Sequence, residues 1–340
     1  MFLPKVVKKI MQGEKLSLED SDFALSEIME GTASEILTSS FLSALALRPL
    51  QGEELAGLAK AMRRFALQLP VEKHPVIDTC GTGGDRKGTF NISTTTAFVC
   101  AGAGIYVAKH GNRSATSSCG SADVLEYLGA VIDLPPEKVL ACLHEVGIGF
   151  LFARKFHPAM ENVAKIRSEL PFPTVFNLLG PLSNPALLDG QIIGVFAREF
   201  LAPVAKALQR LGIKRGFVVW GSDGIDEISP SGKTEIYEVS EGDIKYYQVL
   251  PENYGIERHS IDEIKGGTVK KNAEIIRSVL SGEKSPYRDS VLLNSAFAIL
   301  ASGKTSDWKD AMELAEESID SGNAIRKLEE LISYSRYLAK

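Results

Sequence analysis

The sequence predicts an α/β protein in which a small all-α domain precedes a large α/β domain with a mostly parallel central sheet. Residues 1–70 have helix-like apolar spacing throughout, whereas from Val76 onward short apolar runs alternate with helical segments. A chain of 340 residues also exceeds the usual size of one hydrophobic core. We therefore expect a helical domain over residues 1–72 and an α/β domain over residues 73–340.

The N-terminal segments carry the helical pattern. In EDSDFALSEIMEG, apolar side chains recur at near-helical spacing and the pattern stops at a glycine. The stretches TASEILTSSFLSALALR and GEELAGLAKAMRRFALQL place apolar residues on one face in the same way. These observations predict three or four short helices that form a unit ending at Pro70.

The pattern changes after this unit. PVID, GIYVAK, QIIGVFA and RGFVVWG are short apolar runs typical of buried strands. CGSADVLEYLGA, PEKVLACLHEVG and LAPVAKALQRLG have helical spacing and end at glycines. After Asp226, KTEIYEVSEGDIKYYQVL alternates with period two, which predicts antiparallel strands beyond the parallel core, and the remainder of the chain is predicted to return to helix.

The composition is that of an ordinary globular protein, with 44% hydrophobic and 24% charged residues. The net charge of -5 argues against a general nucleic-acid-binding protein, because neutralising phosphates needs a surplus of Lys and Arg. Four cysteines without a CxxC pair indicate reduced thiols in a cytoplasmic protein. We expect neither a signal sequence nor a membrane span, since the longest nearly apolar run, AFVCAGAGIYVA, is too short.

The stretch VIDTCGTGGDRKGTFNIST directly follows a predicted strand, the position at which open α/β sheets bind ligands. Backbone N–H groups of Gly81–Asp85 could line an anion-binding concavity, and NIST begins a helix whose N-terminus favours an anion. The stretch is not a Walker A loop, because Lys87-Gly88-Thr89 is in the wrong order, and Arg86 excludes GxGxxG. A tight turn without a ligand remains the alternative for this stretch alone.

A second segment, KHGNRSATSSCGS, follows the next predicted strand and combines Lys109 and Arg113 with a row of hydroxyl groups. Charge-assisted hydrogen bonds from such side chains suit a polyanion. A basic surface loop is the alternative interpretation. Two loops of this kind after neighbouring strands favour a phosphate site.

The third segment, WGSDGIDEIS, places Asp226 and Glu227 at the end of a buried strand. Adjacent carboxylates there suit Mg²⁺, which takes one or two of them and leaves positions for water and phosphate oxygens. A solvated turn is the alternative.

The fourth segment, FHPAMENVAKIRSEL, begins a helix near His157-Pro158. Met160, Ala164 and Arg167 lie at i, i+4 and i+7, so the arginine shares a face with small and apolar residues. Such a face could meet a planar organic acid, with the guanidinium binding its carboxylate. An internal ion pair of the arginine is the alternative.

Taken together, the segments resemble the anthranilate phosphoribosyltransferase family. The matching motifs occur in order along the chain: GTGGD, NIST, KHGNR, SSCGSADVLE, HPAM, FNLLGPLSNP and DGIDEIS. The resemblance implies transfer of the phosphoribosyl group from 5-phosphoribosyl 1-diphosphate (PRPP) to the amino group of anthranilate, with one or two Mg²⁺ ions per subunit. It also implies the nucleoside phosphorylase/phosphoribosyltransferase-like fold, a segment near 159–186 that returns to the helical domain, and a homodimer formed through that domain.

The resemblance further implies roles for individual residues, carried over by matching motifs. The residues expected to bind PRPP lie in the first two loops: Gly81, Gly84, Asp85, Thr89, Asn91, Ile92, Ser93, Thr94, Lys109, His110, Gly111, Asn112, Arg113, Ser114, Ala115, Thr116, Ser117 and Ser121. Those expected near anthranilate are Gly81, His110, Asn112, His157 and Arg167. The expected Mg²⁺ ligands are Ser93, Asp226 and Glu227, and no covalent nucleophile is expected.

Two rival functions compete with this one. Pyrimidine nucleoside phosphorylases share the fold and a similar Lys-Ser-Gly-rich loop, but they would need base-recognising residues in place of HPAM and the Arg167 helix, and they use orthophosphate. A non-enzymatic nucleic-acid-binding relative should have a basic groove and lose NIST or the Asp-Glu pair. The chain keeps both motifs and has a net charge of -5, so this second rival is remote.

Overall fold

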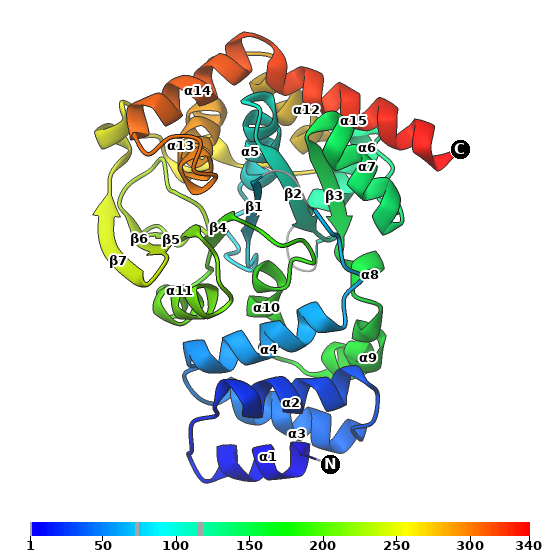
Figure 1. The fold of residues 1–340 in the computed structure, drawn as a ribbon. Helices are drawn as coiled ribbons and strands as arrows, with labels where there is room; N and C mark the ends of the chain where they lie inside the picture. Colours follow the sequence, from blue (N-terminus) through cyan, green and yellow to red (C-terminus); the bar gives the residue numbers. More distant parts are fainter. Residues whose placement is uncertain (1, 72–74, 115–117) are drawn as a thin grey trace.

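A computed structural model describes residues 2–71, 75–114 and 118–340. Helices at one end of the molecule lie beneath a central sheet that is covered by further helices on its far side (Figure 1). The N-terminal helices are α1 (Leu3–Met11), α2 (Leu18–Met29), α3 (Glu35–Ala46) and α4 (Gly52–Arg64). The predicted N-terminal helical unit is thus confirmed, with four helices in its described part.

Local sequence signals explain where these helices begin. Ser17 caps α2 by accepting a hydrogen bond from the backbone of Asp20, whose side chain accepts one from Ser17 in return. Ser34 caps α3 through Leu37 N–H. Helices α2 and α4 cross closely at Gly57, because a Cβ there would lie 2.1 Å from the carbonyl oxygen of Leu18.

The sheet has seven strands in the order β3-β2-β1-β4-β5-β6-β7. The strands are β1 (Val76–Gly81), β2 (Tyr106–Gly111), β3 (Ile148–Phe152), β4 (Gly190–Gly194), β5 (Arg215–Gly221), β6 (Thr234–Ser240) and β7 (Asp243–Val249). The pairs from β3 to β5 are parallel, and β6 and β7 are antiparallel. The chain leaves β1 toward β2 and later returns to β4 on the other side of β1, which makes this the topological switch point where such sheets bind ligands.

The predicted strands are confirmed, but the sequence pattern did not predict β3. Its five residues, IGFLF, follow directly after Gly147, the left-handed C-cap of the preceding helix, and lead straight into another helix. A run this short between two helices has too little alternation for its period to be recognised.

The other α-helices lie around the sheet. They are α5 (Ile92–Gly102), α6 (Ser121–Leu128), α7 (Pro136–Val146), α8 (Ala153–Phe156), α9 (Glu161–Glu169), α10 (Phe176–Leu182), α11 (Leu201–Arg210), α12 (Val269–Leu280), α13 (Pro286–Ala301), α14 (Trp308–Asp320) and α15 (Asn323–Ala339). Short 3₁₀ helices occur at Pro158–Met160, Arg198–Phe200, Pro251–Tyr254 and Ile261–Ile264. None of the helices in the described ranges combines the length and apolar character needed to cross a bilayer.

Two hydrophobic clusters form the core, one on each side of the sheet. Neighbouring residues of β4 point to opposite faces, so Ile192 packs with α5, α13 and the other upper helices, whereas Ile193 packs with the lower cluster. The lower cluster joins the N-terminal helices to α9, α10 and α11 through side chains such as Val163 and Phe176. The lower helices are therefore packed continuously against the underside of the sheet (Figure 1).

Candidate active site

The glycine-rich loop begins where β1 ends. Gly83 and Gly84 have φ angles of 64° and 85°, the left-handed region that glycine adopts without a Cβ penalty. The loop is tied to the end of β4, since Thr82 N–H donates to Gly194 O at 2.9 Å and Phe196 N–H donates to Thr82 Oγ1 at 3.0 Å. The loop therefore lies at the switch point between β1 and β4.

Asp226, in the loop after β5, fits against two glycines. A Cβ on Gly81 would lie 2.3 Å from a carboxylate oxygen of Asp226, and one on Gly194 would lie 1.5 Å from its carbonyl oxygen. Gly83 N–H donates to the same carboxylate at 2.8 Å. The ends of β1, β4 and β5 thus meet at one aspartate.

Glu227 faces the start of helix α5. Its carboxylate accepts a hydrogen bond from Ser93 N–H at 3.2 Å, and Thr79 Oγ1 donates to Ser93 O at 2.8 Å, which joins the helix start to β1. Thr94, the next residue of this helix, is buried, and Asn91 is the N-cap. The amides at this helix N-terminus therefore point into the region of the carboxylate pair.

The two carboxylates repel each other in a region of low dielectric. Burial raises the pKa of Asp226 to about 7, and the charge of Asp85 adds to the effect. Burial also raises the pKa of Glu227 well above its ordinary value, with a further contribution from Asp226 that Lys109 and Ser93 N–H partly offset. Such a pair favours a bound cation.

Mg²⁺ suits this donor set, because it needs only one or two protein carboxylates and takes its remaining ligands from water and phosphate. Within the described residues there is no group of three or more His, Cys, Asp and Glu side chains that could enclose a metal by themselves. The pair could therefore supply only some of the ligands of Mg²⁺, and oxygens of water or phosphate would have to supply the others.

Lys109 brings a positive charge to the same place from β2. Its side chain is buried, and Nζ donates to Thr79 O at 2.6 Å. Its charge partly offsets the rise that burial causes in the pKa of both Glu227 and Asp78, so the amine lies within electrostatic reach of the carboxylate pair. The lysine and the two acidic residues therefore occupy one region.

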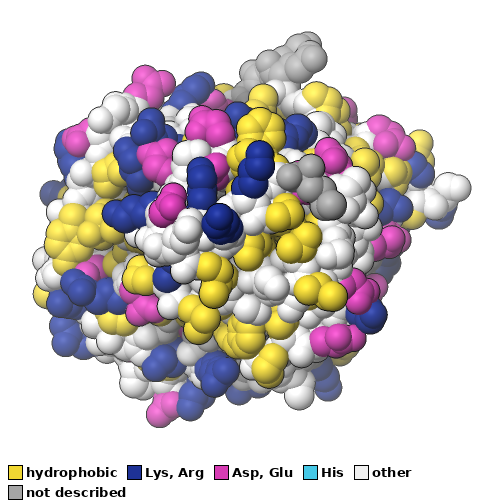
Figure 2. All heavy atoms as spheres, turned by 90° about the horizontal axis from the view of Figure 1, so that it is seen from below, with side chains coloured by type: hydrophobic (Ala, Val, Ile, Leu, Met, Phe, Trp, Pro, Cys, Tyr) yellow, Lys and Arg dark blue, Asp and Glu magenta, His cyan; other side chains and the backbone are white. Residues whose placement is uncertain are grey.

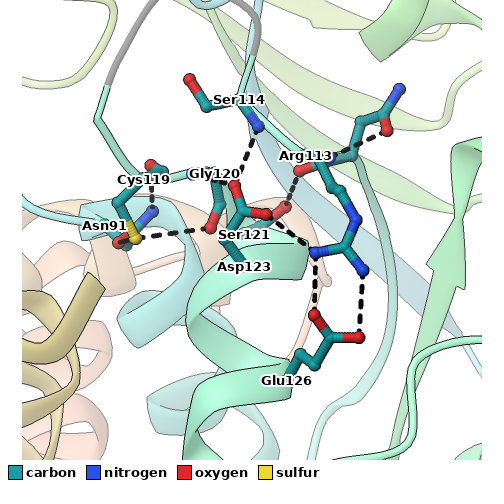
Figure 3. Close-up of polar contacts among 9 residues, drawn as sticks. Asn91, Arg113, Ser114, Cys119, Gly120, Ser121, Asp123 and Glu126 are labelled. Atoms are coloured by element: carbon teal, nitrogen blue, oxygen red, sulfur yellow. Dashed lines mark hydrogen bonds and ion pairs between the residues drawn. The ribbon is translucent and has the colours of Figure 1, made fainter. Parts of the chain in front are cut away.

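The loop after β2 is held by carboxylates of helix α6. Arg113 binds Asp123 at 3.0 Å and Glu126 at 2.8 Å, and the N–H groups of Ser114 and Gly120 donate to Asp123 (Figure 3). The guanidinium predicted to bind PRPP is therefore engaged within the protein. Sequence reasoning missed these acidic partners, although both lie in the first two turns of the helix that follows the loop.

Other predicted residues of this loop adjoin the start of α5. Asn91 Nδ2 donates to Cys119 O at 3.2 Å, and Ser121 Oγ donates to Asn112 O at 3.4 Å (Figure 3). A Cβ on Gly111 would lie 2.2 Å from Ser121 Oγ, which explains the glycine at the end of β2. The predicted contacts Ala115, Thr116 and Ser117 lie outside the described residues.

The rest of the glycine-rich stretch is anchored from the far side. Thr89 forms an antiparallel bridge with Lys265, Gly266 N–H donates to Gly88 O at 2.9 Å, and Phe90 N–H donates to Ile264 O at 3.1 Å. Ile92, the first residue of α5, is buried in the upper core. Both ends of the stretch are thus fixed, whereas Gly83 and Gly84 at its turn are exposed.

Two histidines form a buried pair below the sheet. Their Nε2 atoms are 3.2 Å apart, and His110 Nδ1 lies 3.2 Å from Gly180 O. Burial lowers the pKa of His110 to about 3 and that of His157 to about 4, so both rings are neutral near pH 7. Because a carbonyl can only accept, His110 carries its proton on Nδ1, and His157 Nε2–H therefore donates to His110 Nε2.

Arg167 lies on helix α9, with its guanidinium 4.9 Å from the centre of the Phe176 ring. No carboxylate of the described part of the chain forms an ion pair with it. The alternative of an internal ion pair is therefore not realised, and the guanidinium can still bind an acid.

A cavity of about 810 Å³ lies at the junction of the helical and α/β parts. It is lined by the α3–α4 connection, by residues 173–175 with Leu178, and by residues 196–206 in part. Among the lining residues is Phe196, whose N–H holds Thr82. None of the predicted substrate contacts is among its lining residues.

Comparison with known proteins matches residues 73–325 to the α/β domain of a glycosyl transferase family and residues 4–66 to its helical bundle domain. The chain is 50% identical over 339 residues to an anthranilate phosphoribosyltransferase from Rubrobacter xylanophilus, covering 99% of each chain. It is 45% identical over 333 residues to one from Petrotoga mobilis, covering 98% of this chain and 97% of the relative.

Solved structures give the same result. The anthranilate phosphoribosyltransferase of Thermus thermophilus superposes with a TM-score of 0.92 at 45% identity, covering 97% of this chain and 99% of the other. The Saccharomyces cerevisiae enzyme in complex with PRPP and Mg superposes with a TM-score of 0.90 at 34% identity, covering 98% of each chain.

Proposed function

The chain belongs to the anthranilate phosphoribosyltransferase family, and from this premise we propose how its residues carry out the reaction. The enzyme transfers the 5-phosphoribosyl group of PRPP to the amino group of anthranilate. The products are N-(5-phosphoribosyl)anthranilate and pyrophosphate, a step of tryptophan biosynthesis, and the enzyme uses Mg²⁺. The nucleoside phosphorylase alternative is not favoured.

We propose that PRPP lies across the ends of β1 and β2. The amides of the Gly81–Asp85 loop and of the α5 N-terminus would donate to its phosphate oxygens, and Lys109 would exchange its bond to Thr79 O for one to a phosphate. Arg113 would act on PRPP indirectly, by holding the loop after β2 against helix α6.

Asp226 and Glu227 would hold Mg²⁺, with the Ser93 hydroxyl as a further oxygen ligand. When bound, the ion neutralises the negative charge that develops on the departing pyrophosphate. The observation that supports this assignment is the placement of two crowded carboxylates beside the glycine-rich loop, joined to it by the Gly83–Asp226 hydrogen bond.

Anthranilate would approach from the helical side, between the histidine pair and Arg167. Arg167 would bind its carboxylate, with the guanidinium oriented by the Phe176 ring. His110 and His157, being neutral, would position the acid, together with Asn112 and the Gly81 backbone. The aromatic amine of anthranilate is unprotonated at neutral pH, so the protein needs neither a strong base nor a covalent nucleophile, and positioning supplies much of the rate.

A direct assay tests the function. The protein is mixed with PRPP, Mg²⁺ and anthranilate, and the loss of anthranilate fluorescence is followed, with thymidine and orthophosphate as the control pair. Turnover of the first pair alone is expected. Turnover of thymidine instead would replace the function by the phosphorylase alternative, and Asp226→Asn with full activity would remove the metal assignment.

We also propose that the chain forms a homodimer through its helical part. Apolar side chains gather on the face seen from below the helices (Figure 2). Met11 of α1 and Ile36 of α3 are 75% and 79% exposed, and Leu47, directly after α3, is 88% exposed, so these large apolar side chains are available to a partner. A second copy is the simplest partner, because a symmetric contact would cover the same face of both chains.

Two further assignments complete the proposal. We assign residues 1–72 and the segment near 159–186 to one unit, because α9 and α10 share the core of the N-terminal helices, and the remainder of 73–340 to the α/β domain. We place the enzyme in the cytoplasm. All four cysteines are free and buried, and free thiols are typical of a reducing compartment.

A further inference from the structure

The loop that carries Asp226 and Glu227 is fixed by one buried side chain from a distant helix. Asn294 of α13 accepts a hydrogen bond from Ile228 N–H at 3.0 Å and donates one to Ile228 O at 3.0 Å. Its amide also donates to Ser290 O, within its own helix, at 2.9 Å. Both Asn294 and Ile228 are almost completely buried.

A buried asparagine inside a helix lowers the stability of a protein unless its hydrogen bonds compensate. Asparagine is a poor residue for a helix interior, and a buried amide destabilises a protein unless its hydrogen bonds are made. Here both amide protons and the carbonyl oxygen have partners, and two of the three bonds go to the N–H and C=O of a single residue. The side chain therefore pairs with Ile228 as a neighbouring strand would.

The paired residue is the one next to Glu227. Ile228 N–H belongs to the peptide group that joins the two residues, so fixing it fixes the direction in which the Glu227 side chain leaves the backbone. The same loop is also held by Asp223, which precedes the Asp226–Glu227 pair. Its carboxylate accepts hydrogen bonds from Ile225 N–H at 3.2 Å and from the hydroxyls of Ser229 and Ser231. Those bonds close the loop on itself, whereas Asn294 connects it to the helices above the sheet.

We propose that Asn294 is a positioning residue for the Mg²⁺-binding pair: it holds the backbone beside Glu227 so that both carboxylates face the PRPP loop. The inference rests on the proposed function, because it concerns the same metal site. Asn294 would contact neither the substrates nor the metal and would act through Ile228.

Two variants test it. Asn294→Leu keeps the shape of the side chain but leaves both backbone groups of Ile228 without partners, and Asn294→Ser retains one hydroxyl for partial pairing. The Mg²⁺ concentration that gives half-maximal activity is expected to rise roughly 10-fold in Asn294→Leu, as for other residues that orient metal ligands, and less in Asn294→Ser. Activity at saturating Mg²⁺ should recover much of the loss, and KM for anthranilate should stay unchanged.

The matched control is Ser335→Ala. Ser335 is also buried, and its Oγ accepts from Val131 N–H at 3.0 Å, so it fastens a loop to a helix away from the metal pair. Its loss should lower the melting temperature without changing the Mg²⁺ requirement. If the Asn294 variants lose only thermal stability, as this control does, Asn294 is merely structural and the inference is wrong.

The design separates this inference from the proposed function. A wild-type protein that does not consume PRPP and anthranilate contradicts the function. A wild-type protein that is active, and whose Asp226→Asn variant alters the Mg²⁺ dependence while both Asn294 variants do not, contradicts the positioning role alone. Mn²⁺ binding followed by electron paramagnetic resonance gives the same comparison without turnover, and weaker binding to Asn294→Leu than to Ser335→Ala is expected.

Discussion

Gly83 N–H donates to the Asp226 carboxylate at 2.8 Å across a separation of 143 residues. This bond couples the glycine-rich loop to the acidic pair. A change in the protonation or occupancy of Asp226 is therefore transmitted directly to the backbone expected to hold PRPP.

Replacement of Gly194 should disrupt this coupling. A Cβ there would lie 1.5 Å from the carbonyl oxygen of Asp226, and backbone cannot rotate away as a side chain can. Gly194→Ala is expected to lose at least the roughly 1–3 kcal/mol typical of overpacking, and most of its activity. Urea unfolding and the fluorescence assay measure the two effects. Gly232→Ala is the control, since the nearest atom would lie at 3.8 Å; equal behaviour of both variants would contradict the argument.

The histidine pair predicts acid sensitivity. In the unfolded chain histidine takes up a proton below its ordinary pKa of 6.5, whereas the folded protein keeps His157 neutral to about pH 4 and His110 to about pH 3. Protonation of these histidines therefore favours the unfolded chain below pH 6.5. The free energy of unfolding should be highest above pH 6.5 and should decrease as the pH falls toward 4. Each pKa unit corresponds to about 1.4 kcal/mol, so the decrease should be measurable by urea unfolding.

The slope of the free energy of unfolding against pH shows which histidines cause the acid sensitivity. His157→Gln should show a shallower decrease between pH 6.5 and 4 than the wild-type protein, whatever its absolute stability. His144→Gln, which changes an exposed histidine of α7, should follow the wild-type slope. An unchanged slope in His157→Gln would show that the buried pair does not govern acid unfolding.

Arg167 should affect one substrate only. Hydrogen bonds to charged groups contribute about 1.5–3 kcal/mol, so Arg167→Ala should lower kcat/KM for anthranilate roughly 10- to 100-fold. KM for PRPP should change little. Steady-state kinetics with each substrate varied in turn make the comparison, with Arg277→Ala as a control that removes an arginine from a pair with Glu329 on exposed helices. An equal loss for both substrates would contradict the assignment.

A charge on the exposed helical face should separate a dimer. Ile36→Asp places a carboxylate where a second copy would bury it, which costs far more than an exposed apolar side chain. Analytical ultracentrifugation should show a shift from dimer to monomer at micromolar concentration. Tyr127→Asp makes a similar change at an exposed position of α6 and should leave the association unchanged. A wild-type protein that sediments as a monomer would remove the dimer proposal.

Much of the fold was predictable because its signals are local. The apolar runs of β1, β2, β4 and β5 and the serine caps of α2 and α3 depend on residues close together in sequence. The convergence of the strand-end loops was also predictable, since parallel strands place their carboxyl ends at one edge. Local signals were sufficient to predict these helices and strands, and the rule for parallel sheets was sufficient to predict that the loops converge.

The remaining features depend on partners far apart in the chain. Asn294 lies 66 residues from Ile228, and no local pattern distinguishes it from an ordinary helix residue. The ion pairs of Arg113 with Asp123 and Glu126 were likewise not predicted. A motif indicates which ligand a guanidinium could bind, but it does not indicate which carboxylates of the protein lie within reach of it. Whether a charged side chain binds a group of the protein or a ligand depends on the tertiary structure.

The bond from Lys109 to Thr79 O has a consequence for the entropy of ligand binding. A free lysine at a binding site must give up the motion of four side-chain bonds on contact with its ligand, at a cost of up to roughly 2 kcal/mol. Here the amine is already immobilised against the strand when the chain folds. If Lys109 binds a phosphate of PRPP as proposed, the amine would exchange one acceptor for another and would lose little further side-chain entropy.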